Sequence, residues 1–439
     1  MRKLTTLALL LLITLTACIP TTPTPTLAPI PSPTPAPTPT RLPPTQTGLT
    51  TGWYTDNVST QSIRNLSIYA NQGASVMLAY NCYSAGVVAT KRYLDEAQRQ
   101  GIQVWVDMRL HVLNSPTKND WQDFIRGLKE HPAVFGWYIA DEPIWSGPDR
   151  ATLTQYYNWT KEADPDHPVS IGEAWQIWPE YAGPPPCYDV VLMNCYCGWS
   201  GQETGCSDSP DEFNASVRDS YRRWRDGKTA ADAYNVSIQA VPLGFGYQPG
   251  IAQCQGGVRN LTDAEHRWHT SIPLVLGYDT TIFWWDMMDP SMVQTNPHMK
   301  TLTAARFAEI SAIATQMTNG TTNDPHVVVS EPQTNLIYRY GATGNHHVIL
   351  AINTARSAAA DNNGKTLPNV QFTLPVTVNP VEIEVLGEDR TLPVTDGTFT
   401  DTFTRFQVHA YAFTDTMTLL RPSSLPLPPM QMRRPSSKR

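Results

Sequence analysis

The sequence predicts an α/β fold, a (β/α)8 TIM barrel, followed by a small all-β sandwich domain. Three observations support this prediction. Eight short apolar runs alternate with helical patterns between about residues 52 and 290, which is typical of repeated βα units. That segment, about 240 residues long, has the usual size of such a barrel. Beyond about residue 323, only short strand-like runs divided by turn residues remain, as in a β-sandwich.

The expected barrel strands are apolar runs bounded by polar or turn residues. A doubly wound sheet is the alternative, but no glycine-rich phosphate loop follows the first run. The eight strands are Gly52–Asp56, Ser75–Tyr80, Val104–Leu110, Val134–Ala140, Val169–Gly172, Asp189–Cys195, Val236–Val241 and Thr280–Asp286.

Helix signals lie between these runs. Ala89–Gln100 reads as a helix that ends at Gly101, since glycine suits a left-handed position after a helix. Asn119–Glu130 forms a second helical pattern. Ser209–Glu212 has a capping residue followed by proline, and Thr262–Glu265 has the pattern of a capping box. We therefore assign residues 48–320 to the barrel.

The C-terminal part, residues 324–417, is predicted to be a β-sandwich accessory domain. The tail, residues 421–439, is rich in Pro, Ser and basic residues and is expected to be disordered. The strand-like runs of the accessory domain are Val327–Val329, Leu336–Tyr340, His347–Asn353, Val370–Leu374, Val381–Leu386 and Phe406–Phe413.

The N-terminus has the pattern of an export signal over residues 1–18. Two basic residues precede the apolar run Leu4–Leu15, which is too short to span a bilayer and suits a signal peptide. The sequence Leu15-Thr-Ala-Cys18 resembles the lipobox of bacterial lipoproteins. This resemblance implies lipidation of Cys18 and a protein anchored at the bacterial cell surface. An ordinary secretory signal is the alternative. Residues 19–47, rich in Pro and Thr, predict a disordered stalk.

The composition limits the possible partners. The net charge is −7 and no Lys/Arg cluster precedes the extreme C-terminus, which argues against a nucleic-acid partner. The 13 Trp residues favour a carbohydrate partner, because sugar C–H faces stack on indole rings, although a large barrel core would also use them. We expect a monomer without a cofactor.

Six cysteines besides Cys18 make an even count, which in an exported chain suggests disulfides. Six cysteines allow 15 pairings, so no connectivity follows. Zinc is the competing interpretation, but the spacing of Cys195 and Cys197 lacks the two-residue gap of common structural sites, and we expect no metal.

The working residues of such a barrel lie at the C-terminal ends of its strands. Carboxylates, amides and aromatic rings occupy those positions here, a lining that suits a polyhydroxylated substrate. The expected substrate-binding residues are Trp53, Tyr54, Asp107, Arg109, Tyr138, Trp175, Asn194, Tyr196, Gln239 and Trp284.

The fourth strand carries a resemblance to a known family. The stretch Phe135–Pro143, ending in Asp141-Glu142-Pro143, resembles the strand-4 motif of the clan of retaining glycoside hydrolases that have Asn-Glu-Pro there. The resemblance implies that Glu142 is the general acid and that Asp141 replaces an Asn that contacts a sugar hydroxyl. A Glu at the barrel mouth beside an Asp should also have a raised pKa, which a proton donor needs.

The seventh strand departs from that clan, because Gln239 stands where the nucleophilic Glu is expected. Three explanations stay open. Another carboxylate serves, with Asp286, Glu173 and Asp107 as candidates. The substrate supplies its own nucleophile, since the Asp141-Glu142 pair is similar to that of N-acetylhexosaminidases. Or the barrel binds glycans without cleaving them. The expected function is a cell-surface glycoside hydrolase acting on an extracellular oligo- or polysaccharide, and the alternative is a degenerate glycan-binding barrel.

Overall fold

The structure is a computed structural model. It describes the residues 49–55, 58–109, 116–174, 177, 179–183, 187–195, 210–242, 261–283, 297–355, 364–375, 378 and 380–415.

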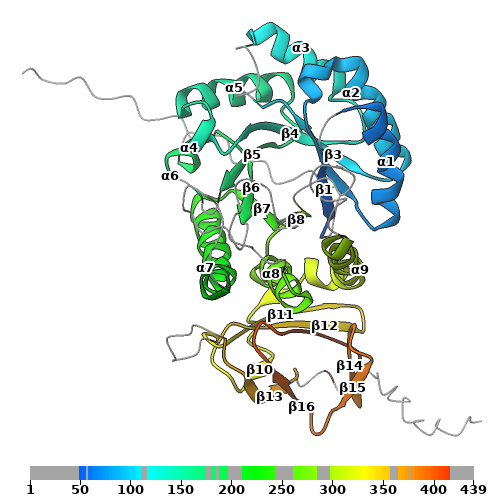
Figure 1. Ribbon diagram of the computed structural model, residues 1–439, viewed down its shortest axis with the longest axis vertical. Coiled ribbons are helices and arrows are strands. Elements are labelled where there is room, and N and C mark those ends of the chain that lie inside the picture. Colours follow the sequence, from blue (N-terminus) through cyan, green and yellow to red (C-terminus); the bar gives the residue numbers. More distant parts are fainter. Residues whose placement is uncertain are drawn as a thin grey trace, which may run out of the picture. The chain divides into compact units, whose positions relative to one another are not determined.

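Eight parallel strands form a closed barrel in chain order, with β8 pairing to β1 (Figure 1). All eight expected strands are present, with ends that differ from the expected ones by up to three residues. The (β/α)8 fold is confirmed. The strands are β1 (Thr51–Thr55), β2 (Val76–Ala79), β3 (Gln103–Asp107), β4 (Val134–Asp141), β5 (Val169–Ala174), β6 (Val190–Cys195), β7 (Ser237–Pro242) and β8 (Thr280–Phe283).

Helices surround the strands (Figure 1). The predicted capping box of α8 is confirmed, since Thr262 accepts from the Glu265 backbone and Glu265 accepts from the Thr262 backbone. Gly101, with φ of +73°, follows α2 as expected. The helices are α1 (Thr60–Asn71), α2 (Cys82–Arg99), α3 (Lys118–Leu128), α4 (Pro143–Ser146), α5 (Arg150–Ala163), α6 (Pro179–Ala182), α7 (Pro210–Tyr234), α8 (Asp263–Leu276) and α9 (Pro297–Thr318). Within the described ranges, no helix has the length and apolarity needed to cross a membrane.

Alternate strand residues divide the barrel core into two layers. The inner layer fills the barrel and includes Trp105, whose ring meets Phe135 edge to face at 4.9 Å between centroids. The outer layer lies between strands and helices. Trp53 belongs to it, fully buried and stacked on Phe307 of α9 at 5.4 Å. A strand residue of this barrel can therefore be fully buried without facing the barrel interior.

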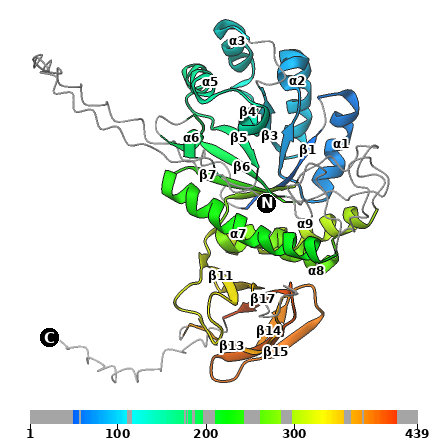
Figure 2. The same cartoon turned by 60° about the vertical axis from the view of Figure 1, so that its left-hand side comes forward.

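Two antiparallel sheets follow the barrel (Figure 2). They share one buried core, in which Tyr411 of the larger sheet contacts Phe372 and Phe399 of the smaller one. The expected strands are present, and β9, β15 and β16 are additional. The smaller sheet has the order β10 (Val328–Val329), β13 (Leu367–Thr373), β16 (Thr398–Phe403), and the larger has β15 (Arg390–Pro393), β14 (Glu382–Val385), β17 (Val408–Thr414), β12 (His346–Asn353), β11 (Leu336–Thr343), β9 (Thr321–Thr322).

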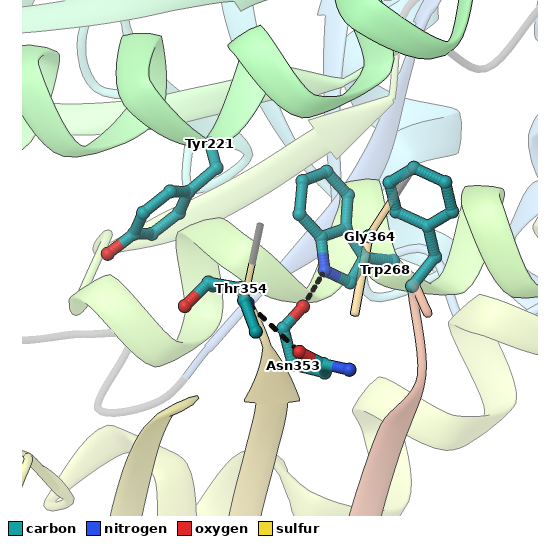
Figure 3. Close-up of a pocket in the computed structure, with 7 residues that line it drawn as sticks. Tyr221, Trp268, Asn353, Thr354 and Gly364 are labelled. Atoms are coloured by element: carbon teal, nitrogen blue, oxygen red, sulfur yellow. Dashed lines mark hydrogen bonds between the residues drawn. The ribbon is translucent and has the colours of Figure 1, made fainter. Parts of the chain in front are cut away.

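Helix α8 packs against the larger sheet. The Trp268 indole N–H donates to the Asn353 carbonyl oxygen at 2.8 Å (Figure 3). The Trp268 ring meets the Phe406 ring edge to face. The cavity beside these groups measures about 10 Å³, which leaves room for no more than one water molecule. Arg267 adds ion pairs to Glu309 of α9, at 2.6 Å, and to Glu388 of the β14–β15 turn, at 3.2 Å. Barrel and sheets thus share a close-packed junction.

The expectation of disulfides is wrong for the three cysteines that the structure describes. Cys82, Cys187 and Cys195 are free thiols in the barrel core. Burial raises the pKa of Cys187 and of Cys195 to about 12, so these thiols stay protonated and unreactive at neutral pH. Each packs as a small apolar side chain in the core. The other cysteines of the chain, Cys18 included, lie outside the described residues.

Candidate active site

A β-bulge in β4 brings two polar side chains to the same face. The pairing of β4 with β5 shifts between Tyr138 and Ala140, so Tyr138 and Asp141 both face Gly172 despite a spacing of three. The Tyr138 hydroxyl donates to Asp141 Oδ1 at 2.7 Å. A Cβ on Gly172 would overlap that hydroxyl and lie 2.8 Å from Asp141 Oδ1. Glycine at position 172 therefore makes room for this hydrogen bond.

Glu142 follows directly and has a left-handed backbone, with φ of +46° and ψ of +56°. Such a conformation costs a non-glycine residue about 1–3 kcal/mol and is typical of functional sites. The Glu142 N–H donates to the Gly172 carbonyl oxygen at 3.0 Å. Its side-chain Oε1 accepts from the Asn194 amide of β6 at 3.1 Å. Glu142 is therefore held from two neighbouring strands, its backbone by β5 and its carboxyl group by β6.

Asp107 and Arg109 form the polar group beside Asp141. Arg109 Nε donates to Asp107 Oδ1 at 3.0 Å, and its Nη1 lies 3.4 Å from Asp141 Oδ2. Its guanidinium carbon lies 3.8 Å from the centre of the Tyr80 ring. Asp107 also accepts from the backbone N–H of Asn81 at 2.6 Å, and Asn81 is left-handed like Glu142. Asp107 thus ties the ends of β2 and β3 together.

Burial is the largest cause of the pKa shifts of two acids, Glu142 and Asp107. It raises the pKa of the Glu142 carboxyl, and the neighbouring charge of Asp141 raises it further, whereas the hydrogen bond from Asn194 lowers it. Burial raises the pKa of Asp107 to about 6, against the opposing effect of Arg109. Glu142 is partly accessible, so it is the group whose raised pKa favours the protonated form and that can still meet a ligand.

Seven of the predicted site residues line the barrel interior or its C-terminal end. Two of them are buried and hydrogen-bond to other residues of the site. Tyr138 is fully buried and donates to Asp141, and Asn194 is 1% exposed and donates to Glu142. These seven residues are Asp107, Arg109, Tyr138, Asp141, Glu142, Asn194 and Gln239.

Three predicted roles need correction. Trp53 faces the helices, so it packs in the outer core and cannot line a substrate site. Gln239 is fully buried and accepts from the Trp105 indole at 3.0 Å, deep in the inner layer, so it is a core residue and not a residue of the barrel mouth. Glu173 follows the inward-facing Gly172 and is fully buried, with its charge acting on Cys187 and Tyr188, so it faces away from Glu142.

For the remaining predicted residues, the structure does not describe where the side chain points. Tyr54 belongs to β1, where it pairs with Leu78 of β2. Outside the described residues lie Trp175, Tyr196, Trp284 and Asp286.

Gly172 is a residue of the site that the sequence reasoning missed. Its signal was a glycine inside a strand pattern, which often marks a close approach of another group. Within the part of the chain that the structure describes, no cluster of three or more His, Cys, Asp or Glu could hold a metal ion. The described arrangement offers a carboxyl group with a raised pKa, an adjacent carboxylate and a guanidinium held by both Asp107 and Asp141.

Comparisons with known proteins support the fold. No family model matches the sequence, and no curated protein matches it. Among solved structures, an α-amylase from Anoxybacillus is 9% identical with a TM-score of 0.50, over 84% of this chain and 99% of that one. An α-L-arabinofuranosidase from Thermotoga maritima, in an arabinose complex, is 11% identical with a TM-score of 0.50, over 84% and 94%. AmyP, in complex with maltose, is 9% identical with a TM-score of 0.50, over 84% and 93%. At these identities the likeness concerns the fold alone.

Proposed function

We propose that this chain is a glycoside hydrolase that acts on an extracellular oligo- or polysaccharide, with Glu142 as the general acid. The observation that carries the proposal is the environment of Glu142: a strained backbone at the end of β4, a hydrogen bond from Asn194 and a raised pKa. A carboxyl group with a raised pKa keeps its proton to a higher pH and can protonate a glycosidic oxygen as the bond breaks.

The proposed reaction consumes one water molecule. The bond between the anomeric carbon and the glycosidic oxygen breaks, its electron pair goes to the oxygen, and the Glu142 proton moves to that oxygen. Water adds to the anomeric carbon and gives up a proton, which restores the carboxyl group. In this proposal Arg109 and Asp141, which lie 3.4 Å apart, bind sugar hydroxyls beside the cleaved bond.

The likeness in fold to an α-amylase, to an arabinofuranosidase and to AmyP, which was solved with maltose, supports carbohydrate as the substrate class. A fold alone does not determine a function, so Glu142 carries the argument. The lipobox-like sequence that ends at Cys18 supports attachment at the bacterial cell surface.

A second candidate function is glycan binding without cleavage. The observation that favours it concerns the carboxylates beside Glu142 in the described part of the barrel. Asp107 is buried and paired with Arg109, Asp141 contacts the same guanidinium, and Glu173 faces away. Asp286 remains the predicted second carboxylate of the hydrolase.

The deciding experiment compares the wild type with Glu142→Gln on a panel of aryl glycosides and polysaccharides. Glu162→Gln is the matched control, because Glu162 lies half-exposed on α5 in an ion pair with Lys118. The hydrolase requires a loss of at least about 100-fold in Glu142→Gln, the low end of the contribution of general acid catalysis, and none in the control. If no protein turns over any substrate and all bind glycan equally, the binding function replaces the hydrolase.

A further inference from the structure

Asn194 occupies a position where an apolar residue would be expected. It lies on β6 with its side chain facing into the barrel, beside Val241 of β7 in the strand register, and it is 1% exposed. Its Nδ2 donates to Glu142 Oε1, whereas its Oδ1 is buried and has no hydrogen-bond partner in the described structure. A buried amide with a hydrogen bond at only one of its two polar atoms stabilises the folded protein less than an apolar side chain of similar shape would. The presence of Asn194 here therefore points to its contact with Glu142.

The orientation of this amide follows from the charge of its neighbour. An ionised carboxylate accepts hydrogen bonds only, so the Nδ2 group must face it, because Oδ1 in that place would set lone pairs against lone pairs. With Nδ2 donating to Oε1, that oxygen is less basic than Oε2. A proton that binds to Glu142 therefore goes to Oε2.

We propose that Asn194 is a positioning residue that reserves Oε1 of Glu142 as a hydrogen-bond acceptor and makes Oε2 the oxygen that carries the proton to the glycosidic oxygen. This inference rests on the proposed hydrolase function and names the atom that performs its proton transfer. When the proton leaves Oε2, the new negative charge spreads onto Oε1, where the hydrogen bond from Asn194 strengthens and stabilises it.

The other charged groups around Glu142 act on it from fixed places. Asp141, on the same strand, raises its pKa directly. Arg109, two residues beyond the end of β3, reaches Glu142 through Asp141, and Asp107 lies buried behind Arg109. On β5, the inward-facing residue is Gly172, and Glu173 faces the helices. In the described structure, Asn194 is the side chain that opposes the rise in the pKa of Glu142.

Two variants test the proposal. Asn194→Leu removes the donor and keeps the branching of the side chain at Cγ, and Asn194→Asp keeps the shape and adds a negative charge. Loss of a hydrogen bond to a charged group shifts a pKa by about one unit. Since the acid must be protonated to act, the basic limb of the pH profile of kcat/KM should move up by about one pH unit in Asn194→Leu and further in Asn194→Asp. The same substitutions at Asn158, exposed on α5, are the controls.

A second readout does not depend on activity. The titration of the Glu142 carboxyl, followed by ¹³C NMR of labelled glutamate and assigned by its loss in Glu142→Gln, should move up in the same order. Circular dichroism checks that each variant is folded. Lower activity in Asn194→Leu with an unmoved Glu142 titration would overturn the proposal, because it would show a purely structural role. Absence of turnover in the wild type would instead overturn the hydrolase function, and the titration would still decide whether Asn194 acts on Glu142.

Discussion

The fit of Gly172 against Tyr138 and Asp141 gives a sharp test of the site geometry. In Gly172→Ala, the added Cβ must displace the Tyr138 hydroxyl, which it would overlap. Overpacking of this kind costs about 1–3 kcal/mol, and the lost hydrogen bond to a carboxylate adds about 1.5–3 kcal/mol. Replacing a strand glycine returns about 0.5–1 kcal/mol. We expect a net loss of about 1.5–5.5 kcal/mol in the free energy of unfolding.

A double-mutant cycle isolates the contact. Tyr138→Phe alone removes the hydroxyl and its bond to Asp141, at a cost of about 2 kcal/mol. In the Gly172→Ala background that hydroxyl is already displaced, and the next ring atom lies at an ordinary 3.4 Å from the new Cβ. The double variant should therefore be no less stable than Gly172→Ala alone, which corresponds to a coupling of at least about 2 kcal/mol.

Urea unfolding of the four proteins measures the cycle. Gly127→Ala in α3 is the control, because the atoms nearest to its Cβ belong to the Val87 side chain, at 3.0–3.7 Å, and a helix gains from alanine. Its free energy of unfolding should stay within about 1 kcal/mol of the wild-type value. Additivity of Gly172→Ala and Tyr138→Phe within about 0.5 kcal/mol would refute the proposed contact between the three residues.

Three further predictions concern the rest of the molecule. Arg267→Met should destabilise the protein by about 3 kcal/mol, because the partly buried carboxylates of Glu309 and Glu388 lose their cation. Arg126→Met, which breaks an exposed ion pair with Asp123, should cost less than about 1 kcal/mol. Urea unfolding of both variants compares the two losses of stability. The pKa of Asp107 is raised in the folded state to about 6, so its contribution to stability is fully present below about pH 4 and is lost as the pH rises to about 6. Relative to Asp107→Asn, the wild type should lose stability across that window, and a flat difference would contradict the assignment. Alkylation in denaturant without reductant, followed by mass spectrometry, should label Cys82, Cys187 and Cys195. Protection of any of these three cysteines from alkylation would reveal a disulfide.

The fold could be predicted because its signals are local. Apolar runs, the Thr262–Glu265 capping box and Gly101 each act within a few residues, and each has the expected structure. It was harder to predict whether a strand side chain faces the barrel interior or the helices, because both faces of a barrel strand are buried and the hydrophobic pattern does not alternate. Trp53 therefore looked like a site residue although the neighbouring Gly52, whose Cβ would overlap the Val76 carbonyl, is the one that faces inward.

Site residues could be predicted where they are contiguous at the end of one strand. Features that depend on how neighbouring strands pair could not be predicted. Asp141 and Glu142 were found from a contiguous motif, and the structure places them at the end of β4. The bulge that aligns Tyr138 with Asp141 depends on the pairing with β5, which a single sequence does not contain. The depth of Gln239 depends likewise on the stagger of the strands around the barrel, which sets its bond to Trp105.

The close-packed junction between α8 and the larger sheet bears on the order in which the chain can fold. Val408, in the last described strand, supplies a carbonyl oxygen to Arg267 at 2.8 Å and an apolar side chain to the core that Trp53 shares. Helices made early in synthesis therefore lack part of their partner surface until the final strand is available. Contacts across so many residues form slowly, so complete folding is a late and cooperative event. The C-terminal sheets are accordingly a part of the barrel's own stability, and not a module that could be transferred to another protein.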